Sequence, residues 1–223
     1  MEVFTKILMV AQKKLITIMS DLYIIDYRLN NTRSVYNSIK KLGFEASISR
    51  SPSDLKKAKK IILPGVGSFD VAMKVLIEEG WDDALLNCME KNDVPLLGIC
   101  LGMQLLSNSS TEGNGCKGLG LIKGKVSKIK PKESEKIPHI GWNSVNQVQK
   151  SPLFNNIPNG CDFYFVHSYK FEVQINSDAL GKTPFSGEFT SVINNSNVFG
   201  VQFHPEKSSK YGLKILDNFL KID

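Results

Sequence analysis

The sequence has few of the residues that would indicate a disulfide-rich, metal-binding or membrane protein. Its four cysteines, Cys88, Cys100, Cys116 and Cys161, form no CxxC pair, which favours reduced thiols in a cytosolic protein. No apolar run reaches the roughly 18 residues that a membrane-spanning helix needs. The three histidines show no zinc-ligand spacing, so we expect neither a metal nor a cofactor.

Charge of one sign is also not concentrated. The formal net charge is +6, but the lysines are scattered along the chain and are expected to lie on solvated faces. Basic residues are not interleaved with aromatic ones, which argues against a nucleic-acid-binding protein. An acidic partner surface or a phosphorylated substrate would explain the excess of positive charge as well as a nucleic acid would.

The first residues look like a signal peptide only at first sight. Gln12, Lys13 and Lys14 interrupt the apolar stretch, and no small-residue cleavage site follows cleanly. Helical spacing of the apolar residues also allows a short amphipathic helix. We favour translation from Met19, with residues 1–18 outside the fold and residues 19–223 forming one domain.

Strand-like and helical segments alternate from Leu22 onward. Apolar runs predict strands at "LYIID", "FEASIS", "KKIILPG" and "VPLLGI", and helices are predicted over 32–42, 70–79, 82–91 and after Cys100. This order predicts an α/β fold: an open, mostly parallel, twisted sheet with helices on both faces. The second half is rich in strand-like runs, predicting additional antiparallel strands before a closing helix over 207–220.

The segment "VPLLGICLGMQLL", residues 94–106, places a cysteine at the junction of a strand and a helix. Gly98 and Gly102 flank Cys100 as glycines flank a nucleophile on a sharp turn, where larger side chains would collide. The amino end of the following helix would stabilise a thiolate. The alternative is an inert core thiol, since free cysteine is often buried.

A cysteine nucleophile needs a histidine, which is itself oriented by a third group. His204 and Glu206 lie two residues apart in "VQFHPEKS". If Pro205 keeps this segment extended, both side chains point the same way and Glu206 can hold the His204 ring against Cys100. The alternative is a surface His-Pro turn.

The loop "LPGVGSF" follows a predicted strand, and we expect the amides of Gly65, Val66 and Gly67 to form an oxyanion hole. Taken alone, the loop is explained equally well as an ordinary turn between a strand and a helix. Together with the cysteine and the histidine, it indicates acyl transfer to a thiol, with hydrolysis as one outcome.

Six motifs in this order carry a family resemblance: "PGVGSF", "GICLGMQLL", "KGLGLIKGKV", "PHIGWN", "YFVHSY" and "VQFHPEKS". From about residue 22 to its end the chain resembles the glutaminase subunits of imidazole glycerol phosphate synthase, which are class I glutamine amidotransferases with a flavodoxin-like sheet. The glycine-flanked turn at Cys100 and the His-Pro-Glu sequence are shared by the whole class. The motifs "PHIGWN" and "YFVHSY" together are more specific and point to these subunits.

The resemblance implies hydrolysis of L-glutamine to glutamate and ammonia. Cys100 would be the nucleophile, His204 the acid and base, Glu206 its orienting carboxylate, and residues 65–67 the oxyanion loop. The residues expected to bind glutamine are Gln104, Glu112, Ser168 and Tyr169.

The resemblance also implies a partner, a (β/α)₈-barrel cyclase subunit that receives the ammonia in a heterodimer and makes imidazole glycerol phosphate for histidine biosynthesis. The residues expected at this interface are Arg28, Asn30, Trp142, Asn143, Tyr164 and Lys207. The aromatic residues among them would serve equally well in a core.

The loop "DYRLNN", residues 26–31, departs from the family pattern Asp-Tyr-Gly-x-Gly-Asn. Arg28 and Asn30 replace glycines, and arginine tolerates a positive φ poorly. This departure puts the partner in doubt more than the glutaminase chemistry. Three alternatives stay open, of which the first follows from it. The same glutaminase could feed a partner that amidinates a surface-polysaccharide sugar; the chain could be an unrelated cysteine hydrolase; or it could be a non-catalytic binding module. Glutamine turnover and thiol labelling at Cys100 separate them.

Overall fold

The structure is a computed structural model that describes residues 21–92, 94–133 and 135–222. The predicted extension over residues 1–18 and the start at Met19 lie outside the described residues. Within the described ranges, no helix combines the length and the apolar character that crossing a bilayer requires.

Five parallel strands form one half of a large sheet, in the order β2-β1-β3-β4-β13. The strands β1, β3, β4 and β13 are short and almost entirely buried, as expected for strands covered on both faces, whereas the edge strand β2 is only partly buried. Their bounds are Leu22–Ile25 for β1, Ser47–Ser49 for β2, Lys60–Gly65 for β3, Leu96–Cys100 for β4 and Val198–Val201 for β13.

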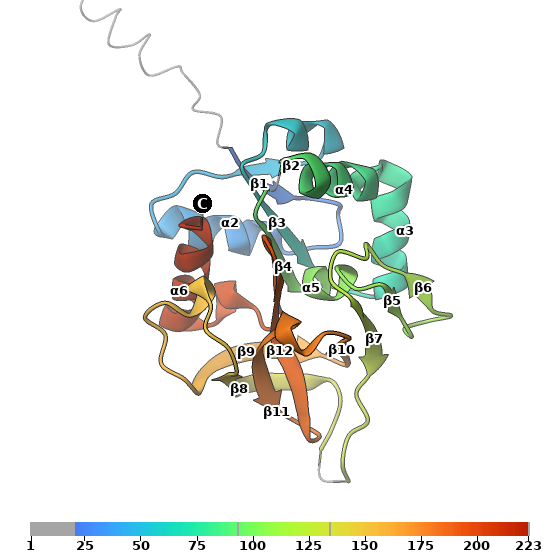
Figure 1. Cartoon of the computed structure of the whole chain (residues 1–223), viewed down its shortest axis with the longest axis vertical. Helices are drawn as coiled ribbons and strands as arrows, with labels where there is room; N and C mark the ends of the chain where they lie inside the picture. The colour runs from blue at the N-terminus through green and yellow to red at the C-terminus, as the bar shows by residue number, and fades with distance from the viewer. Residues whose placement is uncertain (1–20, 93, 134, 223) are drawn as a thin grey trace, which may run out of the picture.

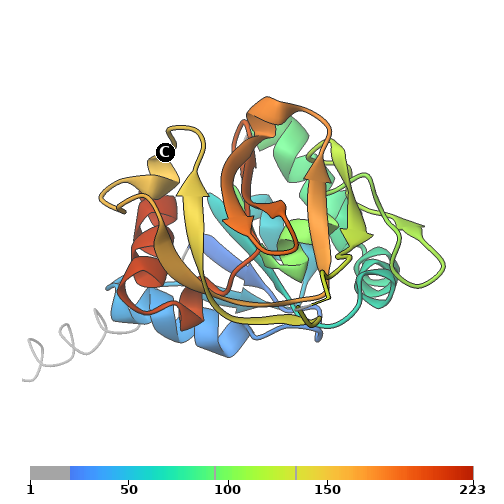
Figure 2. The ribbon, with the colours of Figure 1, turned by 90° about the horizontal axis from the view of Figure 1, so that it is seen from below.

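The second half of the sheet is mostly antiparallel and continues from β13 through β12, β10, β7, β5 and β6, while β11 joins β12 to the β8–β9 hairpin (Figures 1 and 2). The predicted fold class is confirmed, antiparallel strands included. The bounds are Ser109–Ser110 for β5, Cys116–Lys117 for β6, Gly124–Lys128 for β7, His139–Gln147 for β8, Cys161–His167 for β9, Tyr169–Val173 for β10, Ala179–Pro184 for β11 and Glu188–Asn195 for β12.

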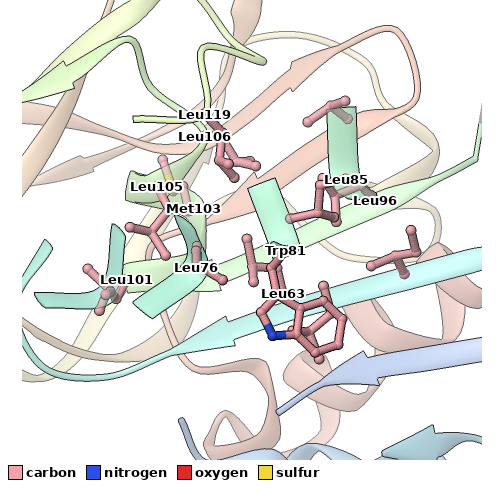
Figure 3. Packing of buried hydrophobic residues seen from close by; sticks show 14 of the residues in the cluster. Leu63, Leu76, Trp81, Leu85, Leu96, Leu101, Met103, Leu105, Leu106 and Leu119 are labelled. Atoms are coloured by element: carbon pink, nitrogen blue, oxygen red, sulfur yellow. The ribbon is translucent and has the colours of Figure 1, made fainter. Parts of the chain in front are cut away.

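Helices cover both faces of the parallel half because its strands alternate their side chains between two cores. Leu22 and Ile24 of β1 face a core shared with α2 and α6, whereas Tyr23 and Ile25 face a core built with α3, α4 and α5. Figure 3 shows the second core, where Trp81 and Leu76 pack over Leu63. The helices are Thr32–Lys41 (α2), Phe69–Glu79 (α3), Trp81–Asn92 (α4), Leu101–Leu105 (α5) and Ser209–Leu220 (α6); short 3₁₀ turns span Pro52–Lys57 (η1), Pro152–Phe154 (η2), Asn176–Asp178 (η3) and Pro205–Lys207 (η4).

Candidate active site

The carboxyl ends of three neighbouring parallel strands meet at the predicted site. Gly65 at the end of β3 pairs with Cys100 at the end of β4. The neighbouring strand β13 ends at Val201, three residues before His204. Open α/β sheets place their ligands at this edge. The sheet order therefore brings together a loop, a thiol and an imidazole that are far apart in the sequence.

Cys100 sits on a sharp strand-to-helix turn in a strained conformation, with φ 56° and ψ −110°. A Cβ on Gly98 would lie 2.7 Å from the Gly102 carbonyl oxygen, and one on Gly102 would overlap the carbonyl oxygen of Leu63. Glycine is thus required on both sides of the turn by close backbone approach. Strain at such a residue is typical of functional positions.

The Cys100 side chain is buried between the ends of two strands that belong to different halves of the sheet. Its thiol lies 3.7 Å from the Val166 carbonyl oxygen at the end of β9, and the side-chain amide of Gln202 lies 3.8 Å from the sulfur. The thiol also hydrogen-bonds to the His204 ring. The sulfur therefore has polar neighbours on several sides, unlike an inert core cysteine.

His204 and Glu206 interact as predicted, but through a different backbone. The Nδ1–H of His204 donates to Glu206 Oε1 at 2.9 Å, and both side chains are almost fully buried. The predicted extended segment is wrong, because residues 205–207 form the 3₁₀ turn η4, for which Pro205 supplies the first position. The turn folds the carboxylate back beneath the ring.

The electrostatics of His204 follow from its two neighbours. Burial disfavours the charged ring, but hydrogen bonds to Cys100 and Glu206 outweigh this effect and raise the pKa of His204 to about 10. The imidazolium is therefore the stable form at neutral pH. A carboxylate can only accept, which fixes a proton on Nδ1.

This shift predicts how stability depends on pH. Because the folded pKa lies above the ordinary value of 6.5, the stabilisation is complete below pH 6.5 and is lost as the pH rises through about 10. In Glu206→Gln the folded pKa should fall, so the difference in unfolding free energy between wild type and variant should shrink from pH 6.5 to 10. Urea unfolding across this range measures it; a difference independent of pH would contradict the assignment.

A cavity of about 350 Å³ opens beside Cys100, a size typical of small-ligand sites. It brings together all four residues predicted to bind glutamine. Its lining is Val66, Gly67, Cys100, Leu101, Gln104, Glu112, Pro138, Val166, His167, Ser168, Tyr169, His204 and Lys207.

Two of these polar side chains are already held by the protein. The buried Gln104 amide donates to the Tyr169 carbonyl oxygen at 3.0 Å and to Gln202 Oε1 at 2.9 Å, which leaves its own carbonyl oxygen for a ligand. Glu112 Oε2 accepts the Phe69 amide at 2.9 Å, and burial raises the pKa of this carboxyl. Both side chains are thus oriented before any ligand binds.

The predicted oxyanion loop lies beside the thiol, but one of its amides is occupied. The Val66 N–H donates to the Leu29 carbonyl oxygen at 3.0 Å. Gly67 has a φ of 102°, which suits glycine alone. To donate into the cavity, the Val66 amide must first leave Leu29, so the loop over residues 26–31 restrains it.

Comparison with known proteins agrees with this geometry. Residues 23–222 match the model of the family described as glutamine amidotransferase class-I. The chain belongs to this family. It is 48% identical to imidazole glycerol phosphate synthase subunit HisH 2 of Methanococcus maripaludis over 89% of this chain and 98% of that one. It is also 48% identical to subunit HisH of Methanocaldococcus jannaschii, with the same coverage. PurLQS from Thermotoga maritima shares the fold, with a TM-score of 0.71 at 21% identity, over 89% of this chain and 96% of the other.

The unusual loop of this class I amidotransferase adopts the conformation that arginine disfavours. Arg28 has a φ of 71°, its amide donates to Asp26 Oδ1 at 3.1 Å, and its guanidinium lies 3.7 Å from Glu79 with 83% of the side chain exposed. Asn30 instead turns inward, donating to the Ile25 carbonyl oxygen at 2.9 Å. Of the two replacements, Arg28 is exposed, whereas Asn30 is half-buried.

The other predicted interface residues of the amidotransferase lie in three different surroundings. Trp142 on β8 is 54% exposed and packs edge-on against Tyr164 of β9, its cross-strand partner. Asn143, the next residue, is tied to the protein through its side chain. Lys207 lines the cavity rather than lying apart from it.

Sequence reasoning missed the cavity residues Leu101, Pro138, Val166 and His167. Val166 and His167 stand directly before the predicted Ser168 in "YFVHSY", so the neighbouring motif was the available signal. Pro138 opens the motif "PHIGWN", but that motif indicated only the family resemblance and the partner interface, so it did not point to the cavity.

Proposed function

We propose that this amidotransferase is the glutaminase subunit of an imidazole glycerol phosphate synthase and hydrolyses L-glutamine to supply ammonia. The observation that carries the proposal is the convergence of Cys100 and His204 at one cavity of suitable size, with Glu206 bonded to His204 behind it. Its resemblance to HisH subunits over nearly their whole length supports the choice within the family.

The chemistry follows from the site. Cys100 attacks the carboxamide carbon as the thiolate, the nucleophilic form of cysteine, so that a C–S bond forms. The His204 imidazolium, held by Glu206, gives its proton to the leaving nitrogen as the C–N bond breaks, releasing ammonia. The neutral ring then takes a proton from water, whose oxygen attacks the thioester carbon. The C–S bond breaks, which restores the Cys100 thiolate and releases glutamate.

The cavity is suited to an amino acid. Glu112 offers a carboxylate for an ammonium group and Lys207 an ammonium for a carboxylate, while Gln104, Ser168 and Tyr169 line the wall between them and the thiol. During attack the negative charge on the carbonyl oxygen needs donors, for which the backbone amides of Val66 and Gly67 in the cavity wall are candidates.

The partner would be a (β/α)₈-barrel cyclase that binds against the exposed Trp142 and its half-buried neighbour Tyr164 and receives the ammonia. Exposed aromatic residues of this kind often dominate binding. Such binding would also reach the loop over residues 26–31 if Arg28 contacts the partner, and this loop holds the Val66 amide through Leu29.

We expect the cyclase subunit, loaded with its nucleotide substrate, to raise glutamate release from glutamine on the order of ten- to a hundredfold, the range of strong couplings between sites. The reason is that Val66 must exchange its bond to Leu29 for one to the substrate. The measurement is the rate of glutamate release by the purified chain, alone and with the cyclase.

Trp142→Ala is the matched control, because it should lose the stimulation while the cavity stays intact. Turnover of glutamine that ignores the cyclase would keep the chemistry and direct attention to a sugar-amidinating partner. No turnover under any condition would overturn the proposed function and favour a different hydrolase or a binding module.

A further inference from the structure

Two buried histidines outside the Cys-His-Glu set connect strand β8 to the cavity wall. His139 of β8 and His167 of β9 are direct cross-strand partners, and both are 6% exposed. His139 Nδ1 lies 2.9 Å from His167 Nε2. The pair stacks among aromatic rings, with Phe185 4.1 Å and Phe165 5.0 Å from His139 between ring centroids.

The hydrogen bonds at either end of the pair fix where every proton lies. The Tyr169 carbonyl oxygen, 2.8 Å from His167 Nδ1, can only accept, so His167 carries its proton on Nδ1. Burial lowers the pKa of His167 to about 3, so the ring is neutral and Nε2 is a bare acceptor. His139 Nδ1 must therefore donate to it.

The other end of the chain of bonds gives the same direction. The Asn143 Oδ1 atom accepts the Ser144 amide at 2.8 Å and Nδ2 donates to the Pro184 carbonyl oxygen at 2.9 Å, which fixes the side-chain amide. Its Nδ2 lies 3.2 Å from His139 Nε2, which must accept. Burial lowers the pKa of His139, opposed by Glu135, in keeping with a bare Nε2. Donation runs in one direction: Asn143 to His139 to His167 to Tyr169.

The last acceptor in this series of hydrogen bonds, the carbonyl oxygen of Tyr169, belongs to a residue of the cavity wall. The Tyr169 carbonyl oxygen also accepts the Gln104 amide at 3.0 Å, so one oxygen holds both Gln104 and His167. His167 itself lines the cavity next to Val166, whose carbonyl oxygen lies against the Cys100 thiol. A shift of His167 would therefore move the wall on which glutamine rests.

We propose that His139 is a positioning residue for the glutamine cavity, acting through His167 to hold the Tyr169 carbonyl oxygen and hence Gln104. It touches no reacting atom. This inference rests on the proposed glutaminase function for its kinetic effect, whereas the bond directions rest on the hydrogen-bond geometry and on the neutral state that burial favours for both rings. The series of hydrogen bonds begins at Asn143, which is next to the exposed Trp142 in the sequence. The same bonds therefore link the proposed partner surface to the cavity.

The first test reads the protons directly. The sequence has three histidines, so ¹⁵N-histidine spectra of the whole chain resolve each ring, with His139→Asn and His204→Gln assigning the signals. We expect both His139 and His167 to be neutral with the proton on Nδ1, the less common tautomer of histidine in water. A proton on Nε2 of either ring would overturn the inference, whether or not the chain hydrolyses glutamine.

The second test separates positioning from packing. His139→Phe keeps the stacked ring but leaves His167 Nε2 unpaired, and it should raise KM for glutamine about five- to tenfold, the effect of one unpaired buried group, while kcat changes less than about twofold. His139→Asn places an amide near the original Nδ1 and should restore most of KM. Phe185→Leu disturbs the same stack without touching the bonds and should lower Tm alone.

Three kinetic outcomes would overturn the inference while leaving the glutaminase intact. These are an unchanged KM in His139→Phe, the same KM change in Phe185→Leu, and no recovery in His139→Asn. Loss of turnover in the wild type would instead contradict the proposed function. Thermal unfolding of each variant shows whether the compared proteins are equally folded.

Discussion

Cys100→Ala is expected to lower the rate of glutamate release from glutamine by at least about a thousandfold, the scale seen when a covalent nucleophile is removed. The substitution deletes the sulfur that would form the thioester in the proposed mechanism but leaves the cavity and the Tyr169–Gln104 contact in place. Glutamine should therefore still bind. A rate assay and a binding measurement on the same protein distinguish lost chemistry from a lost site.

Cys161→Ala is the matched control for this experiment. Cys161 is a partly buried free thiol at the start of β9, on the strand whose other end lines the cavity, and it is not part of the cavity wall. It should keep full activity, and a thiol-directed reagent should inactivate Cys161→Ala as it does the wild type. Residual activity above a few per cent in Cys100→Ala would mean that another group is the nucleophile.

The fold was largely predictable because its core strands are continuous apolar runs. The runs that became β1, β3 and β4 have no other way to bury both faces, so their place in a covered parallel sheet follows from composition. The strand β11, "ALGKTP", was missed. It contains glycine and proline and pairs with bulges, so its place depends on β12 and β8 rather than on its own residues.

The site was predictable only where its chemistry is local in sequence. Gly98, Cys100 and Gly102 form a spacing that can be read directly, and so do His204 and Glu206. The 3₁₀ turn at Pro205 was not read correctly, because proline suits both an extended segment and the first position of a turn. Either backbone brings the carboxylate to the ring, so the correct pair was predicted from a wrong conformation.

Long-range contacts account for what the sequence could not predict. The His139–His167 bond needs the register of β8 against β9, in which a one-residue slip would point one of the rings to the other face. The Val66–Leu29 bond needs the loop after β1 to pass beside the end of β3. Neither the number of residues between the two partners nor their residue types indicates these pairs in advance.

Gly102→Ala is expected to destabilise the fold by about 3 kcal/mol or more, the effect of forcing an atom into a packed core. The added Cβ would overlap the Leu63 carbonyl oxygen of β3, and backbone cannot move aside as a flexible side chain can. Gly80→Ala is the matched control: it lies in open space at the end of α3 with a φ of 77°, so it should cost about 1 kcal/mol from conformation alone. Urea unfolding of both variants measures the difference.

Comparison of these two variants tells whether residue 102, two positions after Cys100, must be glycine because of close packing or because of its backbone conformation. Equal losses would mean that conformation alone matters and that β3 can give way at Leu63. A much larger loss in Gly102→Ala would mean that α5 is pressed against the ends of β3 and β4. In that case Cys100 is held in its left-handed conformation by the packing of the first turn of α5, and the strained thiol depends on a glycine that never touches the substrate.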